Sequence, residues 1–247
     1  GQQQQLEQEE QQQDRVVGLG QMDLSNQKIA NMSLLISLSE SERNDLLSLD
    51  LRNNLIRALD KAALDSLKVT TKELLFSYNQ IELIPSQLIE QNAYQVIYLD
   101  HNCIVEVEAN GIRGYSLQKL YLNHNRFERL RPDSINTPLL ERLYLQNNRL
   151  REFRVNNRYL GTALEYLDLS QNEIEFLYSE TFDSAQLTSL KEIKLYSNRI
   201  AVIGSDAFTG MDSLSRLDLQ NNMIEEMHAY AFRSCKRNER AEQLCAC

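Results

Sequence analysis

One sequence pattern returns through most of this 247-residue chain. Residues 140–150 read LERLYLQNNRL, with apolar residues at the first, fourth, sixth and eleventh places and Asn148 at the ninth. The spacing L-x-x-L-x-L-x-x-N-x-L starts at Leu46, Thr71, Tyr94, Leu117, Leu140, Leu164, Leu190 and Leu214. Successive copies begin 23 to 26 residues apart, and the ninth place is always asparagine. Such regular recurrence predicts a coil of stacked turns rather than a globule.

The chemistry of one turn explains why these residue types recur. Places four to six are expected to form a short strand, so Leu143 and Leu145 point inward while Tyr144 faces outward. A single turn cannot bury its apolar face, so neighbouring turns must cover each other. A buried asparagine is costly unless its amide is satisfied. We therefore expect the ninth-place side chains to bond backbone groups where the strands bend, which makes this column structural and not catalytic.

Later places in each turn keep the same apolar pattern. The fourteenth place holds Leu59, Ile84, Val107, Leu130, Phe153, Leu177, Ile203 and Met227. The nineteenth holds Leu64, Ile89, Ile112, Ile135, Phe182, Phe208 and Phe232, with Arg158 as the exception. The spacing and the Ala-Phe pairs at 207–208 and 231–232 resemble the "typical" extracellular leucine-rich repeats of animals. This resemblance implies an α/β repeat solenoid: a right-handed horseshoe with a concave parallel β-sheet and irregular convex segments.

The repeats divide the chain into three parts. Residues 1–15 form a Gln-rich, low-complexity tail that we expect to be disordered, either inert or partner-binding. Residues 16–232 form the repeat domain of about nine turns, because Leu19, Met22, Leu24 and Ile29 fit a degenerate first turn with Gln27 in place of asparagine. Residues 233–247 are expected to form an atypical or truncated cap. It contains Cys235, Cys245 and Cys247, and its C-x-C resembles the opening of extracellular repeat caps.

Several features favour a secreted protein. Cysteines clustered in a cap suggest disulfides and an oxidising compartment, with zinc binding as the alternative. Asn31-Met32-Ser33 is a glycosylation sequon that matters only in the secretory route. The chain starts at Gly1 without a leader, as a mature chain or a segment of a longer one would. No run of 18 apolar residues spans a membrane. The net charge of −9 disfavours nucleic-acid binding.

The outward places of the strands hold the candidate binding residues. Tyr98, Tyr121 and Tyr144 share the fifth place and should lie about 5 Å apart. Their neighbours are Lys119, Arg142 and Tyr166 at the third place and Tyr78, His101 and His124 at the eighth. Exposed aromatic residues beside arginine are typical of interface hot spots. The alternative is that these side chains only stabilise the sheet by cross-strand pairing.

A second candidate surface is a basic edge. Residues 113–158 contain ten basic and four acidic residues, a net charge of +6 in an acidic chain. The edge consists of Arg126, Arg129, Arg149 and Arg151, and it could steer an acidic partner or only remain solvated. Cys103 shares the tenth place with Arg126, too far from the cap for a disulfide with it. It is either a half-buried thiol or an intermolecular bridge that links an oligomer.

No motif for catalysis or for a cofactor is present. The chain has three histidines, none near a serine or cysteine in a recognisable arrangement, and no phosphate-binding glycine loop. His101, His124 and Asp100 could approach one another, but two histidines do not define a metal site. We therefore predict a non-enzymatic protein without cofactor or metal.

The resemblance extends to secreted and receptor-ectodomain recognition modules of animals, including Toll-type receptors and mosquito leucine-rich-repeat immune proteins. It implies binding of a protein ligand or co-receptor in innate immunity. The mosquito proteins add a coiled coil, and no heptad region is present here. The alternatives are an extracellular matrix or adhesion protein and an intracellular scaffold.

Overall fold

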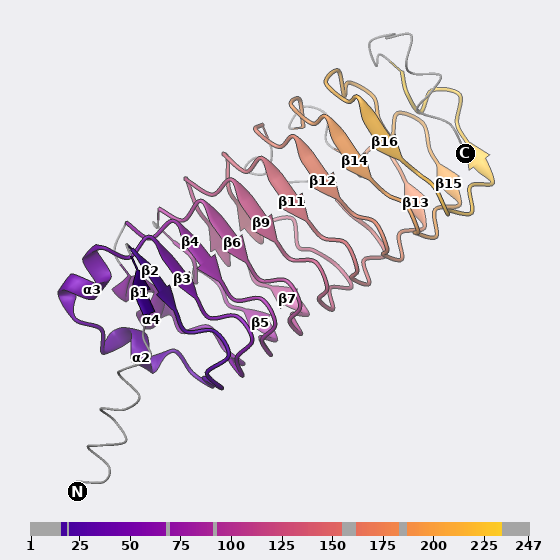
Figure 1. The fold of residues 1–247 in the computed structure, drawn as a ribbon. Coiled ribbons are helices and arrows are strands. Elements are labelled where there is room, and N and C mark those ends of the chain that lie inside the picture. The colour runs from indigo at the N-terminus through magenta and orange to yellow at the C-terminus, as the bar shows by residue number, and fades with distance from the viewer. Residues whose placement is uncertain are drawn as a thin grey trace, which may run out of the picture.

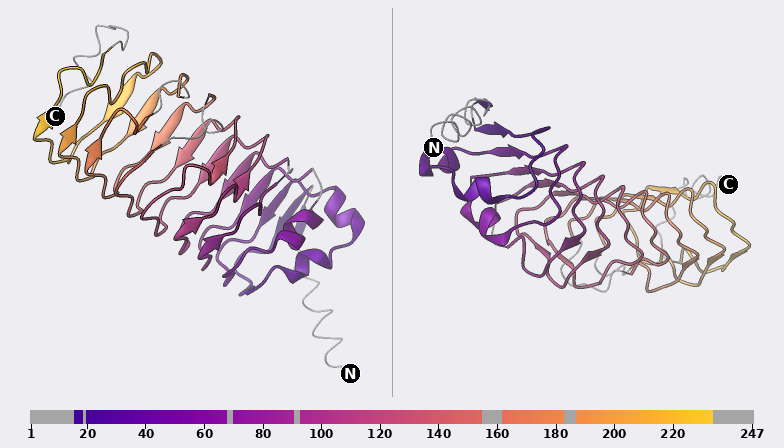
Figure 2. Two further views of the ribbon diagram at one scale, coloured as in Figure 1. Left: turned by 180° about the vertical axis from the view of Figure 1, so that it is seen from behind. Right: turned by 90° about the horizontal axis from the view of Figure 1, so that it is seen from below.

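The structure is a computed structural model that describes residues 16–18, 20–67, 70–90, 93–154, 162–182 and 187–233. Its turns stack into an elongated, curved coil with the two ends far apart (Figures 1 and 2). One ten-stranded sheet runs along the coil in the order β1-β2-β3-β4-β6-β9-β11-β12-β14-β16. The strands are β1 (Val16–Gly18), β2 (Gln21–Asp23), β3 (Ser48–Asp50), β4 (Glu73–Leu75), β6 (Val96–Tyr98), β9 (Lys119–Tyr121), β11 (Arg142–Tyr144), β12 (Tyr166–Asp168), β14 (Glu192–Lys194) and β16 (Arg216–Asp218). Nine of them, β2 to β16, are parallel in consecutive turns. The predicted solenoid is confirmed.

The register of this sheet places equivalent residues of each turn side by side. Leu120 pairs with Leu143, and Leu143 pairs with Leu167. These fourth-place side chains and the sixth-place Leu145 are fully buried. The strands occupy places three to five, one residue earlier than predicted. This shift leaves the inward and outward faces unchanged, because the alternation of side chains is the same.

The ninth-place asparagines form a continuous asparagine ladder through the core, consisting of Asn54, Asn79, Asn102, Asn125, Asn148, Asn172, Asn198 and Asn222. Asn148 shows the pattern. Its Oδ1 accepts the Phe127 amide at 3.1 Å, and its Nδ2 donates to the Leu122 and Leu145 carbonyls at 3.0 Å each. Asn125 also donates to Leu122, so this carbonyl is held from two turns. Both polar atoms of the buried Asn148 amide are hydrogen-bonded, which is the structural role that the sequence predicted.

The face opposite the large sheet changes along the coil. It begins with α2 (Ser33–Ile36), α3 (Glu40–Asn44) and α4 (Lys61–Ser66). It continues with short strands that pair in parallel: β5 (Leu83–Ile84) with β7 (Glu106–Val107), β8 (Ile112–Arg113) with β10 (Ile135–Asn136), and β13 (Phe176–Leu177) with β15 (Val202–Ile203) and β17 (Glu226–Met227). The expectation of irregular convex segments is therefore wrong for these residues, because equivalent backbone groups of adjacent turns pair even there.

Local sequence explains the helices near the N-terminus. Ser39 and Glu42 form a capping box at the start of α3, since each side chain accepts the other residue's backbone N–H. Asp60 caps α4 by accepting the amides of Ala62 and Ala63.

The first turn carries a feature that the sequence did not predict. β1 pairs antiparallel with β2, so a hairpin closes the edge of the large sheet. Gly20 turns the chain at φ +80°, and a Cβ there would lie 2.8 Å from the Asp45 carbonyl oxygen. β1 is therefore the end strand of the sheet, and its length of three residues limits the edge open to pairing with another chain.

The outer apolar places are mostly buried as predicted. Phe153, Phe182, Phe208 and Phe232 follow one another with ring centroids 4.9–6.2 Å apart. Met227 departs from the fourteenth-place pattern, because its side chain is 39% exposed in the last described turn. The tail of residues 1–15, the exceptional Arg158, and the cap cysteines Cys235, Cys245 and Cys247 lie outside the described residues.

Candidate partner-binding surface

The candidate surface starts from three tyrosines on the large sheet. Tyr98 pairs with Tyr121, and Tyr121 with Tyr144, in the parallel register of β6, β9 and β11. Their rings stack with centroids 4.4 and 4.3 Å apart and planes 11° and 5° from parallel. All three side chains are half-buried. We call these residues the tyrosine column. Because the faces of the rings cover each other, the column offers ring rims and hydroxyl groups to a partner.

The column continues into a charged cluster around Tyr166. This ring tilts 44° from Tyr144 at 5.1 Å, and the Arg142 guanidinium and Lys194 ammonium groups lie 5.5 and 5.3 Å from its centroid. The Tyr166 hydroxyl donates to Asp168 Oδ2 at 3.1 Å. Lys119 lies beside Arg142 in register. The cations therefore stand next to the aromatic rings, as cation–π contacts require.

A second stack runs along the eighth place of the turns. The Tyr78 and His101 rings lie 4.2 Å apart, and the His101 and His124 rings lie 4.1 Å apart, all within 17° of parallel. His101 Nδ1 is 2.8 Å from Asp100 Oδ2, and the Nε2 atom of His124 is 3.4 Å from Asn147 Nδ2. We call Tyr78, His101 and His124 the eighth-place stack.

The backbone explains why these side chains project. All eight eighth-place residues have φ between 52° and 59°: Asn53, Tyr78, His101, His124, Asn147, Gln171, Ser197 and Asn221. In this left-handed conformation the His124 amide donates to the Gln146 carbonyl of the next turn at 3.0 Å. Residues other than glycine adopt such a conformation at a cost of about 1–2 kcal/mol. The repeat geometry therefore dictates the direction of the side chain at this place.

The environment changes the proton affinity of several groups. Burial, followed by the neighbouring tyrosines, raises the pKa of Tyr121. Burial and then Asp168 raise the pKa of Tyr166. Burial and then His101 lower the pKa of His124, so its neutral form is favoured near neutral pH. The surface thus presents neutral rings beside the permanent charges of Lys119 and Arg142.

Two amide oxygens between the stacks have no partner among the described residues. They are Asn123 Oδ1 and Gln146 Oε1, both at the seventh place and both buried. Their neighbour Asp100 is satisfied, because Ser77 donates to Oδ1 at 2.6 Å and His101 contacts Oδ2. This arrangement can bind through hydrogen bonds and ring contacts. In the described part of the chain, no group of three or more His, Cys, Asp or Glu residues could hold a metal ion.

The remaining predicted residues lie elsewhere on the coil. Arg126, Arg129, Arg149 and Arg151 are all exposed. Arg151 approaches Glu173 at 3.9 Å. Cys103 is half-buried with a free thiol. Asn31 is exposed, and its Oδ1 accepts the amide and hydroxyl groups of Ser33 at 3.0 and 2.5 Å.

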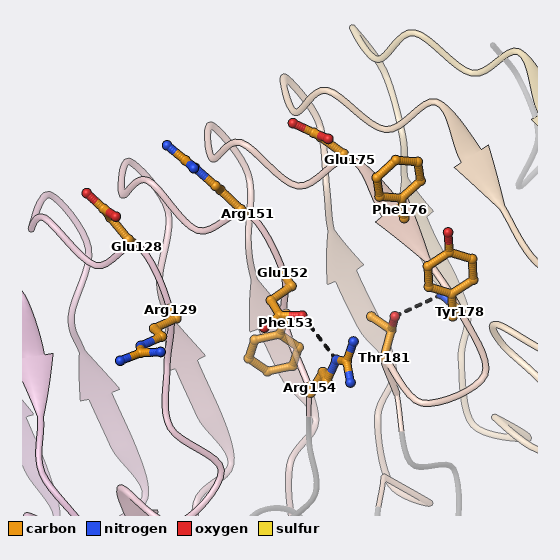
Figure 3. Close-up of a pocket in the computed structure, with 10 residues that line it drawn as sticks. All are labelled: Glu128, Arg129, Arg151, Glu152, Phe153, Arg154, Glu175, Phe176, Tyr178 and Thr181. Carbon is orange, nitrogen blue, oxygen red and sulfur yellow. Dashed lines mark hydrogen bonds and ion pairs between the residues drawn. The ribbon is translucent and has the colours of Figure 1, made fainter.

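Sequence reasoning missed a hollow on the flank of the coil. Figure 3 shows it crossing three turns, from Glu128 and Arg129 through Arg154 to Phe176 and Tyr178. Its volume is about 660 Å³, and an adjoining hollow of about 570 Å³ shares Arg129, Glu152 and Arg154. We call the pair of hollows the flank hollow. The basic edge predicted from the sequence contains Arg129 and Arg151, but the sequence pattern did not single out Phe176 or Tyr178.

Comparison with known proteins identifies the class. A family model described as "Leucine rich repeat" matches residues 188–237, and a second one matches residues 116–137. The parallel coil and its asparagine ladder have the architecture of a leucine-rich-repeat solenoid, and these matches agree with it. No helix in the described residues is long and apolar enough to cross a membrane.

The similar proteins include Toll-like receptors. Toll-like receptor 3 of Bos taurus is 34% identical over 71 residues, which are 29% of this chain and 8% of that protein. Toll-like receptor 4 of Bos taurus is 31% identical over 78 residues, 32% of this chain and 9% of the receptor. Leucine-rich repeat-containing G-protein coupled receptor 5 of Rattus norvegicus is 39% identical over 61 residues, 25% and 6% of the two chains. The chain thus spans less than a tenth of each.

Solved structures show the same fold. The Toll–Spatzle complex of Drosophila matches with a TM-score of 0.72 and 22% identity, over 81% of this chain and 26% of that one. The TLR13–ssRNA13 complex matches with a TM-score of 0.70 and 24% identity, over 78% and 27%. One of these neighbours is in complex with a protein and the other with RNA. At this identity the likeness concerns the fold alone.

Proposed function

We propose that this chain is the recognition domain of a secreted, non-enzymatic innate-immune protein and that it binds a protein partner on its concave sheet. The observation that carries the proposal is the tyrosine column with its charged neighbours Lys119 and Arg142. Aromatic residues and arginine are the residue types that contribute most to binding at protein interfaces. The similarity to Toll-like receptors supports an immune role.

The chemistry of the surface favours a protein over a nucleic acid. The chain is acidic, with a net charge of −9, whereas phosphate backbones are bound by large basic surfaces. Lys119 and Arg142 supply a local positive field that suits carboxylates of a partner. The hydroxyl groups of the tyrosine column suit hydrogen-bonding groups of a partner's backbone or side chains. A protein carries both kinds of group.

The central test removes the tyrosine column. Wild-type protein and a Tyr98→Ala/Tyr121→Ala/Tyr144→Ala variant are immobilised and exposed to extracellular fluid of the source organism, and bound proteins are quantified by mass spectrometry. We expect the variant to lose at least tenfold in recovery of its main partner. A Tyr115→Ala/Tyr230→Ala variant is the matched control, because both tyrosines are exposed outside the column.

The outcomes separate the alternatives. Unaltered recovery by the triple variant would remove the concave-face proposal and favour a matrix or adhesion role with contacts spread over the edges. Partner capture that disappears after ribonuclease treatment would point to RNA instead of protein. Mass spectrometry of native material tests secretion: reduced cysteines and an unmodified Asn31 would favour the intracellular scaffold.

A further inference from the structure

The flank hollow lies apart from the concave sheet. The tyrosine column lies on the ten-stranded sheet, whereas Phe176 belongs to β13 in the separate three-stranded sheet. The hollow crosses three turns, so residues about 25 positions apart in the chain line it together. A ligand seated there need not touch the tyrosines.

One wall of the hollow is aromatic and exposed. Phe176 and Tyr178 are 42% and 46% exposed, and their rings stack 5.9 Å apart at 13°. The thirteenth place of the two preceding turns holds Arg129 and Glu152 instead, so the fold itself does not require an aromatic residue here. Two neighbouring aromatic rings exposed to solvent indicate a binding site, because a ligand that covers them would bury apolar surface.

The aromatic wall is held in place before any ligand arrives. The Tyr178 amide donates to the buried Thr181 Oγ1 at 2.9 Å (Figure 3). Its ring lies over Gly204 of the next turn, where an added Cβ would be 3.0 Å from Tyr178 Cδ1. Phe153 closes the hollow from the core side with only 3% exposure. Such pre-organisation lowers the entropy cost of binding.

The polar wall carries Arg129, Arg151 and Arg154 together with three glutamates, Glu128, Glu152 and Glu175. Arg129 has no ion pair with any described residue, and it lines both parts of the hollow. Among the described residues, Arg154 forms an ion pair only with Glu152 of its own turn, at 3.1 Å, and both side chains are about 60% exposed. An exposed pair of this kind contributes little and can be exchanged for a ligand carboxylate. Glu128 and Glu175 project from the outer rim, away from Arg154 (Figure 3).

We propose that the flank hollow binds an acidic, hydrophobic peptide segment of a protein partner. Its carboxylates lie between Arg129 and Arg154, and its apolar side chain packs on Phe176 and Tyr178. Arginine forms bidentate hydrogen bonds with carboxylates, which fixes the register of such a segment. This proposal does not depend on the concave-face function.

The test uses a random heptapeptide library displayed on phage and selected on the full chain. In parallel, the library is selected on an Arg129→Glu/Arg154→Glu variant and on a Phe176→Ser/Tyr178→Ser variant. The changed side chains are exposed, and circular dichroism checks that each variant is folded. We expect wild-type protein to enrich peptides that join Asp or Glu to Phe, Leu or Trp, and both variants to lose them.

Calorimetry with the synthesised consensus peptide then measures the effect. Each flank variant should bind at least tenfold more weakly, and wild-type binding should weaken as NaCl rises. Matched controls are Leu83→Ser, at the same place as Phe176 in an earlier turn, and Arg57→Glu; both should stay within twofold. The triple tyrosine variant should also stay within twofold, which keeps this test separate from that of the concave face.

Three results would overturn the proposal. They are no enrichment over an empty surface, a consensus without acidic residues, and equal binding of the consensus peptide by wild type and the flank variants.

Discussion

Replacing Asn148 by leucine tests the asparagine ladder at its centre. Leucine has a similar size but no polar atoms, so the Phe127 amide loses its acceptor. The carbonyls of Leu122 and Leu145 each lose one of two donors, because Asn125 and Asn172 still bond them. An orphaned buried N–H costs about 1–3 kcal/mol and each lost shared bond about 0.5–1 kcal/mol, so the total is roughly 3 kcal/mol. At about 2–4 °C per kcal/mol for a chain of this size, the melting temperature should fall by roughly 6–12 °C.

Tyr144→Ala is the comparison variant. It removes two ring contacts, at 4.3 and 5.1 Å, on a half-exposed surface. Such contacts contribute about 0.5–1.5 kcal/mol each, so the two together contribute roughly 2 kcal/mol and a fall of roughly 4–8 °C is expected. Calorimetry gives both shifts, and hydrogen exchange of the Phe127 amide locates the defect. Equal melting shifts, or a Phe127 amide that remains as protected in Asn148→Leu as in wild type, would refute the reasoning.

Gln171→Val should destabilise the protein by about 1–2 kcal/mol in urea unfolding, because a β-branched residue is forced to φ 52°, whereas Gln220→Val should be near neutral. The pKa of Tyr166 is raised in the folded state, so this residue stabilises the fold below the ordinary tyrosine pKa of about 10 and loses that contribution as pH rises. In scans from pH 8 to 11, the melting temperature should therefore fall less steeply for Tyr166→Phe than for wild type. Non-reducing electrophoresis should show a monomer for wild type and Cys103→Ser alike, and a dimer in wild type alone would establish the intermolecular bridge. Glycosidase treatment should shift secreted wild type but not Asn31→Gln on a gel, and no shift in either means that the sequon is unused.

The sequence predicted the fold well because one short-range rule repeats. Leucine spacing sets which side of each strand is buried, and the asparagine column follows once adjacent turns are in register. For the same reason the sequence placed Tyr98, Tyr121 and Tyr144 in one row. Their role in binding stays a prediction, since stacked rings alone also stabilise a sheet.

Other features depend on contacts that a repeat pattern does not contain. Tyr78 and Gln171 belong to residue types that seldom adopt positive φ, so the left-handed eighth place was not evident from them. The β1–β2 hairpin lies before the first complete repeat and follows no periodic rule. The flank hollow is lined by residues of different turns, such as Arg154 and Tyr178. The spacing of residues within one turn does not predict such a hollow.

Carbonyls bonded from two turns have a consequence for the length of the coil. Deleting residues 117–139, one whole unit, would bring Asn148 against the Leu99 carbonyl and the Ile104 amide, which Asn125 now serves. The seam would close with every ninth-place asparagine bonded, while the tyrosine column and the eighth-place stack would each lose one member. A protein built this way can be shortened by whole repeats and still keep the same kind of core.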